Sequence, residues 1–286
     1  NLSSKIQKNL SFELTNDQIN SLIEIRNDLS KNEQMYRLIQ GDVGCGKTIV
    51  ALLAIADIIN NDYQAVIMAP TEILANQHYE YFRKIFSPYK INIEMITGKT
   101  PVKAKNDIYK RIHNNNIKIL IGTHSVYNSS IKFKNLGLIV IDEQHKFGVK
   151  QRINLLEKAV GCHTLIMSAT PIPRSLSFAL YGEISTSNIK NKPKGRKEVI
   201  TSIISIDQIN KLLDGIKRKL EKKEQIFWIL PTIDTSDSEK QTVVSRFEFL
   251  KQKFKGKVGC VHGKMKKEEI SNVMRDFRDK NIMLLV

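Results

Sequence analysis

The stretch from Gly41 to Thr48 constrains the fold of this chain more than any other part of the sequence. It fits the pattern G-x-x-x-x-G-K-[ST], with an apolar run at 36–39 before it and an Ala-, Leu- and Ile-rich run at 49–54 after it. A turn of this kind presents backbone N–H groups and the positive end of a helix to a bound anion. We therefore expect a strand, a phosphate-binding loop and a buried helix in succession, rather than a chance match in an ordinary β–α turn.

The residue types within this loop indicate its ligand. In this pattern the lysine, here Lys47, reaches the β- and γ-phosphates of a nucleoside triphosphate, and the hydroxyl of Thr48 holds Mg²⁺. Cys45 needs no catalytic role. The residues expected to contact the nucleotide are Gly41, Asp42, Val43, Gly44, Cys45, Gly46, Lys47 and Thr48.

The charge balance favours a polyanionic partner. The chain carries 45 Lys and Arg residues against 29 Asp and Glu, which leaves a net charge of +16. Lysine and arginine displace counterions from a phosphate backbone, so such an excess is typical of proteins that bind nucleic acid. A lysine-rich bias that places charge on any solvated surface remains the alternative explanation.

Cysteine usage and hydropathy limit the cellular setting. Cys45, Cys162 and Cys260 are odd in number and widely separated, so neither a disulfide framework nor a C-x-x-C metal pair is expected. This pattern predicts a reducing, cytoplasmic environment. No apolar run approaches the ~20 residues of a membrane span, so no membrane partner is expected. The chain starts at Asn1 without a signal-peptide pattern or an initiator Met, and an excerpt of a longer chain is one explanation of this start.

Short apolar runs alternate with helical patterns through the first two thirds of the chain. Such alternation predicts βαβ units and a parallel sheet, hence the α/β class. After the phosphate loop, five predicted strands each run into a polar turn, at 64–69, 91–96, 117–121, 136–141 and 162–167. Ligands of open α/β sheets bind beyond the carboxyl ends of the strands, so we expect the chemistry to lie on one edge of one sheet.

The pattern lapses after residue 184. Residues 185–200 are polar, basic and turn-rich, and we interpret them as a linker between a domain at 1–184 and a second at 201–286. Strands and helices alternate again in the second segment. It ends on an apolar run at 282–286, so we expect the second domain to be incomplete.

An acidic pair follows the apolar run at 138–141. A strand-end carboxylate beside a phosphate loop is placed to hold the Mg²⁺ that bridges the terminal phosphates, and we assign this role to Asp142. The second carboxylate, Glu143, would orient and deprotonate the attacking water. In isolation, an acidic strand-end turn with no chemistry would explain the pair equally well.

These residues carry a resemblance to a known family. The segments 47–48, 142–145 and 168–170 resemble the first three motifs of superfamily two helicases of the DExH type. Longer matches at 41–48, 69–75, 142–149, 168–174 and 258–265 resemble the RecG family of branch-migrating DNA helicases, over nearly the whole chain. The related transcription-repair coupling translocases generally have Glu where Gln144 stands, which favours RecG. The resemblance implies two RecA-like P-loop NTPase domains, with ATP and Mg²⁺ in the cleft and branched or forked DNA across the top.

The resemblance also implies roles for individual residues. Gln18, with Phe12 and Thr15 nearby, matches the segment that contacts adenine, although alone it would be a solvated helix residue. Gln144 and His145 join the catalytic set, and Ser168, Ala169 and Thr170 couple nucleotide state to DNA grip. The implied DNA contacts are Pro70, Thr71, Glu72, Thr97, Gly98, Gly122, Thr123, His124, Ser125, His262 and Gly263. Hydroxyls and loop N–H groups suit backbone phosphates, yet each segment is also an ordinary turn.

The departures from the family pattern limit the expected activity. Only residues 1–11 precede Phe12, where the family has a wedge domain that grips branched DNA, and its fifth and sixth motifs are not in this sequence. Arginines of the sixth motif reach the γ-phosphate, and an arginine finger is worth ~10³-fold or more in rate. Arg174 is no substitute, because it lies in the third-motif region.

Three hypotheses follow. The first is a monomeric RecG-type motor whose missing half comes from the rest of a longer chain or from a partner in trans. The second is a remnant that binds nucleotide and DNA without efficient hydrolysis. The third, an unrelated P-loop NTPase such as a small-molecule kinase, is disfavoured by the turns at 142–145 and 168–170.

Overall fold

The computed structural model describes residues 1–127, 130–143, 161–170, 184–193, 199–232 and 242–286. The chain divides into two compact units, Asn1–Lys197 and Glu198–Val286. Each unit is described by itself below.

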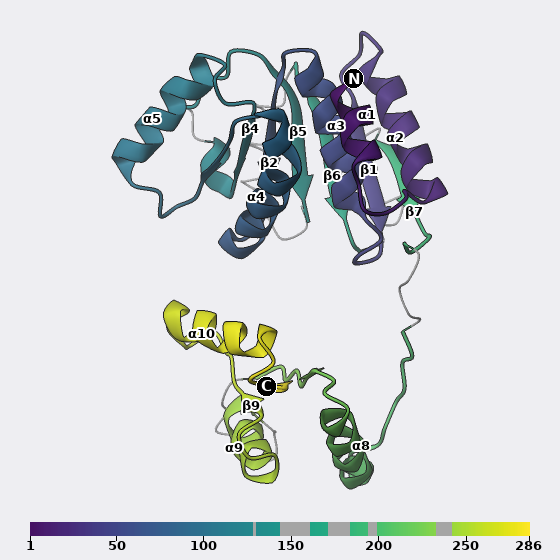
Figure 1. Ribbon diagram of the computed structural model, residues 1–286, viewed down its shortest axis with the longest axis vertical. Helices are drawn as coiled ribbons and strands as arrows, with labels where there is room; N and C mark the ends of the chain where they lie inside the picture. The colour runs from purple at the N-terminus through teal and green to yellow at the C-terminus, as the bar shows by residue number, and fades with distance from the viewer. Residues whose placement is uncertain (128–129, 144–160, 171–183, 194–198, 233–241) are drawn as a thin grey trace. The chain divides into compact units, whose positions relative to one another are not determined.

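The first unit is built on a seven-stranded sheet in which every described strand pair is parallel (Figure 1). The strand order is β3-β4-β2-β5-β6-β1-β7, so the carboxyl ends of all strands lie at one edge. The strands are β1 (Tyr36–Gly41), β2 (Gln64–Met68), β3 (Ile93–Ile96), β4 (Ile119–Gly122), β5 (Leu136–Asp142), β6 (His163–Ser168) and β7 (Ser185–Ile189). The predicted α/β class with a parallel sheet is confirmed.

Helices cover both faces of this sheet. The helices are α1 (Leu2–Lys8), α2 (Asn16–Leu29), α3 (Lys47–Asn60), α4 (Glu72–Phe86) and α5 (Val102–His113), with short 3₁₀ turns at Ser87–Tyr89 and His124–Tyr127. Side chains of α1 to α4 join one apolar cluster and side chains of α5 join a second. The strands alternate between the two clusters: Ile39 and Ile67 belong to the first, Leu38 and Val66 to the second. This period of two is the expected consequence of the pleat.

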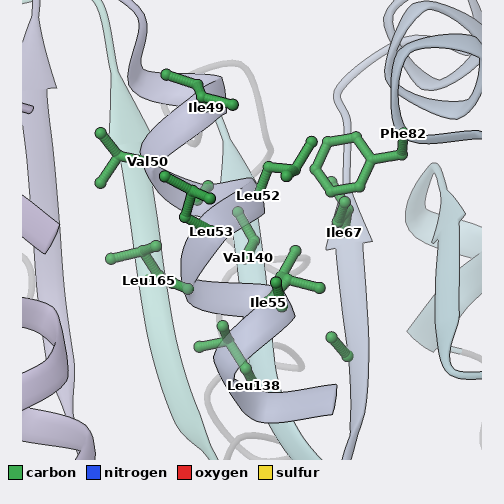
Figure 2. Close-up of a cluster of buried hydrophobic side chains, with 14 of the residues drawn as sticks. Ile49, Val50, Leu52, Leu53, Ile55, Ile67, Phe82, Leu138, Val140 and Leu165 are labelled. Carbon is green, nitrogen blue, oxygen red and sulfur yellow. The ribbon is translucent and has the colours of Figure 1, made fainter. Parts of the chain in front are cut away.

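Helix α3 lies at the centre of the first cluster. Leu52, Leu53 and Ile55 of α3 pack with Ile67 of β2 and Val140 of β5 (Figure 2). All three α3 side chains are fully buried, because this helix is apolar nearly all round. The packing fixes the helix against the sheet, and it therefore fixes the position of the helix N-terminus at the end of β1.

The structure corrects the start of the predicted linker. Residues Ser185–Ile189 form β7, which pairs in parallel with β1 from Arg37↔Ser185 to Gly41↔Ile189. The prediction of a linker at 185–189 was wrong. β7 is an edge strand in which only Ser187 and Ile189 are buried, so its sequence is mostly polar. Ser187 is satisfied by the buried guanidinium of Arg37, whose Nη1 donates to its hydroxyl at 2.8 Å. A polar edge strand lacks the apolar run by which the other strands are predicted.

The second unit repeats the α/β pattern on a smaller scale. Its described strands form a parallel sheet in the order β8-β10-β9, and its core includes Leu213, Leu250 and Leu284. The elements are a 3₁₀ turn (Ile206–Gln208), α8 (Ile209–Glu221), β8 (Ile226–Phe227), α9 (Val243–Lys253), β9 (Val258–Gly259), α10 (Lys267–Arg278) and β10 (Leu284–Leu285). Within the described ranges of both units, no helix has the length and apolar character needed to cross a membrane.

Candidate nucleotide and nucleic-acid site

The predicted phosphate loop joins the end of β1 to the start of α3. Gly44 and Gly46 adopt left-handed backbone conformations, with φ of 74° and 88°, which side-chain-bearing residues rarely adopt. In the described part of the chain, the N–H groups of Gly44, Gly46, Lys47 and Thr48 have no hydrogen-bond acceptor. A row of donors at a helix N-terminus fits a phosphate group.

Lys47 lies over this loop. Its side chain folds back so that Nζ donates to the carbonyl oxygens of Gly41 at 2.6 Å and Asp42 at 3.1 Å. The residue is only 8% exposed. Phosphate oxygens are stronger acceptors for an ammonium group than these neutral carbonyls. The arrangement therefore suits the predicted contact with the terminal phosphates.

Gln18 of α2 is hydrogen-bonded to the phosphate loop. Its Nε2 donates to the carbonyl oxygen of Cys45 at 2.7 Å, and its Oε1 accepts the N–H of Thr15 at 2.9 Å in the capping box of α2. Gln18 is 1% exposed, and its side chain links α2 to the phosphate loop by hydrogen bonds. The adenine contact stays a prediction. Phe12 is exposed and lines a surface hollow with Ile19, where its ring is accessible to a base.

The acidic pair lies at the end of β5. Asp142 is its last residue, and Oδ2 of its carboxylate lies 2.8 Å from Nε2 of His78. Glu143 follows with a φ of 48°, which turns its carboxylate toward the end of β6, where it accepts the N–H of Ala169 at 3.1 Å. Gln144 and His145 lie outside the described residues.

Asp142 and Thr48 suit the predicted Mg²⁺. Both supply hard oxygen atoms, and Mg²⁺ is usually bound by one or two carboxylates together with substrate phosphates and water. Among the described residues there is no group of three or more His, Cys, Asp or Glu side chains that could hold a metal ion. The chemistry of Asp142 and Thr48 therefore fits the predicted Mg²⁺, which stays a prediction.

The predicted coupling turn lies between the acidic pair and the phosphate loop. Strand β6 pairs with β5 on one side, Asp142 opposite Met167, and with β1 on the other, Gln40 opposite Ser168. Oγ of Ser168 lies 3.1 Å from Oγ1 of Thr170, and Nε2 of Gln40 donates to the carbonyl oxygen of Thr170 at 3.2 Å. The turn thus contacts the strands that carry both halves of the nucleotide site.

The three predicted DNA-contact loops of the first unit also lie together. They follow the neighbouring strands β3, β4 and β2. The N–H of Ala69 donates to the carbonyl oxygen of Gly122 at 2.9 Å, and Glu72 forms an ion pair with Lys99 at 3.3 Å. A Cβ on Gly122 would lie 2.1 Å from the carbonyl oxygen of Ile96, so glycine permits the close approach of the ends of β3 and β4.

Exposure differs among the residues of these loops. Thr71, Gly98 and His124 are exposed, whereas Thr97 and Thr123 are buried. Oγ1 of Thr97 accepts the N–H of Lys99 at 3.3 Å within its turn, whereas Oγ1 of Thr123 is buried and has no hydrogen-bond partner among the described residues. The exposed groups are those accessible to a ligand. His262 and Gly263, the remaining predicted contacts, lie in the second unit after β9.

Polar contacts made by the segment that follows β7 could not be predicted from the sequence. The carboxylate of Asp17 accepts the N–H groups of Asn191 and Lys190, each at 2.8 Å. These hydrogen bonds lower the pKa of Asp17, and the bond from Asn191 has the larger effect. Lys192 forms an ion pair with Asp42 at 3.2 Å, which lowers the pKa of Asp42. The segment after β7 is thereby joined to both α2 and the phosphate loop. Its basic sequence indicated only a linker.

Comparison with known proteins agrees with this geometry. The profile of the DEAD/DEAH box helicase family matches residues 15–178, and that of the helicase conserved C-terminal domain matches residues 205–286. The chain is 40% identical to the ATP-dependent DNA helicase RecG of Thermotoga maritima, over 100% of this chain and 37% of the relative. It is 41% identical to RecG of Aquifex aeolicus, over 99% of this chain and 36% of the relative.

Solved structures give the same result. A structure of RecG bound to a three-way DNA junction superposes with a TM-score of 0.80 at 38% identity, covering 100% of this chain and 37% of that one. The DEAD-box helicase Mss116 bound to ssRNA, at 22% identity and a TM-score of 0.71, shows a shared fold. The chain therefore spans a little over a third of the length of these RecG relatives. The resemblance to RecG is confirmed, and the chain belongs to the DEAD/DEAH box helicase family.

Proposed function

We propose that this chain is the ATP-driven motor segment of a RecG-type DNA helicase that remodels branched or forked DNA. One observation carries the proposal. The nucleotide-site residues follow β5, β6 and β1, and the predicted DNA-contact loops follow β3, β4 and β2, which are the two neighbouring halves of one sheet. The proposed ATP site and the proposed contacts with the DNA backbone would thus lie along the same edge of the sheet.

On the nucleotide side, the loop N–H groups and Lys47 bind the phosphates. Thr48 and Asp142 hold Mg²⁺, which when bound neutralises charge on the phosphates. Glu143 orients the attacking water and takes its proton. Its bond to Ala169 supports this role, because it fixes the carboxylate at the edge of the site.

On the DNA side, the exposed groups of the strand-end loops contact phosphates without reading sequence. The net charge of +16 favours such binding. The junction-bound RecG structure supports a branched substrate for that relative, and we extend this substrate class to the chain. Changes at Glu143 on nucleotide binding and hydrolysis would pass through Ala169 to the turn that follows β6.

The test is ATP hydrolysis with and without forked DNA. The complete protein, with its remaining motor segments, is expected to hydrolyse ATP faster with the fork present. Its Lys47→Ala variant is expected to lose hydrolysis while keeping its DNA affinity. Lys5→Ala, an exposed lysine of α1, is the matched control and should behave as wild type. Hydrolysis that survives Lys47→Ala would refute the site assignment. Binding of both ligands by the wild type without turnover would favour the non-hydrolysing alternative.

The state of the native protein is a separate question. The RecG relatives are longer than this chain, so we propose that the remaining motor segments come from a longer polypeptide or from a partner in trans. We also propose that the protein is a monomer. A cytoplasmic location is proposed because Cys45, Cys162 and Cys260 are free thiols, as is usual in a reducing compartment. The mass of the native protein, measured by light scattering, separates a longer polypeptide from a chain of this length that needs a partner in trans.

A further inference from the structure

A buried histidine joins the two halves of the sheet. His78 is in the second turn of α4, and its Nε2 lies 2.8 Å from Oδ2 of Asp142 at the end of β5. Helix α4 begins directly after the loop Pro70–Thr71, with Thr71 as its N-cap. The contact therefore connects the helix that follows a predicted DNA-contact loop to the carboxylate assigned to Mg²⁺.

The imidazole is held rigidly in place. Ala75, His78, Phe82 and Phe86 form the buried face of α4. The ring of His78 lies edge-on to that of Phe82 at 6.4 Å, and Phe82 stacks on Phe86 at 6.0 Å. A side chain packed this way has few alternative rotamers, so it can fix the direction of the group to which it is bonded.

The bond also fixes how the carboxylate of Asp142 is turned. The side chains of His78 and Asp142 are 9% and 13% exposed, so the bond is protected from water. With its proton on Nε2, the imidazole donates to Oδ2. Within the described residues Oδ1 has no hydrogen-bond partner, and it is the oxygen left for a hydrated metal ion. Metal ligands are commonly oriented by such outer partners.

We propose that His78 is a positioning residue for the magnesium-nucleotide site. It orients Asp142 and ties that carboxylate to the helix behind the Pro70–Glu72 loop. The inference rests on the proposed function, because it requires that Asp142 serves a bound magnesium nucleotide. Loss of an outer partner typically weakens metal affinity ~10- to 100-fold, and this sets the effect to look for.

The experiment measures magnesium dependence rather than turnover. A fluorescent ATP analogue is bound to the 286-residue chain while Mg²⁺ is titrated, and the Mg²⁺ concentration at half-maximal binding is recorded. His78→Leu keeps apolar packing against Phe82 and removes the donor, and it should raise this concentration at least ~10-fold. Affinity for the analogue in EDTA should stay unchanged. His78→Gln, whose amide can donate to Asp142, should recover part of the loss.

Gln77→Ala, an exposed neighbour on the same helix, is the matched control and should leave the midpoint unchanged. Should the leucine variant not fold, His78→Phe fills the place of the ring and serves the same test. A purely structural role would weaken binding equally with and without Mg²⁺ and would overturn the inference, as would an unchanged midpoint. Wild-type protein that binds no magnesium nucleotide would instead refute the proposed function.

Discussion

The carboxylate of Glu143 accepts the backbone N–H of Ala169, with oxygen–nitrogen distances of 3.1 and 3.3 Å. The bond crosses from the end of β5 to the end of β6, and a second bond, from the N–H of Glu143 to the carbonyl oxygen of Met167 at 2.9 Å, runs beside it. The residue proposed to activate water is therefore bonded to the turn proposed to couple nucleotide state to DNA grip. These bonds give a direct route by which a change at Glu143 can reach the turn.

Glu143→Gln tests the role of this carboxylate. Glutamine keeps the size of the side chain and an oxygen that can accept the Ala169 N–H, but it cannot take a proton from water. We expect hydrolysis to fall ~100-fold or more, with nucleotide and DNA binding retained, measured by single-turnover hydrolysis on forked DNA. Glu80→Gln, on the exposed side of α4, is the control. Hydrolysis at the wild-type rate would remove Glu143 from the mechanism.

Gly46→Ala tests the fit between α2 and the phosphate loop. A Cβ at Gly46 would lie 2.2 Å from Nε2 of Gln18, and its φ of +88° already disfavours a side chain. We expect nucleotide binding to be lost and the free energy of unfolding to fall by about 1–3 kcal/mol, measured by denaturant titration.

Gly98→Ala is the matched control for that experiment. The nearest atom to a Cβ at Gly98 is Oε1 of Glu72 at 4.0 Å, so an alanine meets no clash there. Stability and nucleotide binding should remain at wild-type levels. A Gly46→Ala variant that binds nucleotide as well as Gly98→Ala does would show that Gln18 does not constrain the loop.

The ion pair between Arg37 and Asp28 predicts a pH dependence of stability. Burial raises the pKa of Asp28, but hydrogen bonds from Lys31 and Arg37 outweigh it, so the pKa is lowered from its ordinary value of 3.8. Unfolded protein then binds a proton more readily than folded protein. The stabilisation is complete above pH 3.8 and is lost as the pH falls through the folded pKa.

Asp28→Asn should therefore destabilise the protein at neutral pH and lose its disadvantage under strong acid. Denaturant titrations of both proteins across this range measure the difference in free energy of unfolding. A gap that stays constant into acid would mean that the charge of Asp28 contributes nothing.

The three thiols should differ in reactivity. Cys45 and Cys162 are buried, and burial raises the pKa of Cys162 to about 12, whereas Cys260 is partly exposed. The reactive species is the thiolate, so a thiol reagent at neutral pH should modify Cys260 first and the other two only after unfolding. Cys260→Ser should remove the fast phase. Rapid labelling of Cys162 in native protein would contradict the packing around β6.

Local sequence determined the phosphate loop, the buried strands and the family motifs of this protein. The glycine pattern and Lys47 indicated the phosphate loop, because a left-handed turn at Gly46 is a property of that residue type itself. Apolar runs such as 64–69 indicated buried parallel strands, since a strand covered on both faces is apolar at every position. The resemblance to RecG was likewise visible in contiguous motifs, and the comparisons confirmed it.

Tertiary structure decided what depends on residues far apart in the chain. Strand β7 is polar, and it forms because its backbone pairs with the edge of β1 and its Ser187 hydroxyl accepts a hydrogen bond from the guanidinium of Arg37. His78 meets Asp142 only because β2 and β5 are neighbours in the sheet. No local period encodes such pairings. Hydrogen bonds and ion pairs between distant residues form once the packed core fixes the backbone, and the core therefore determines which polar groups meet.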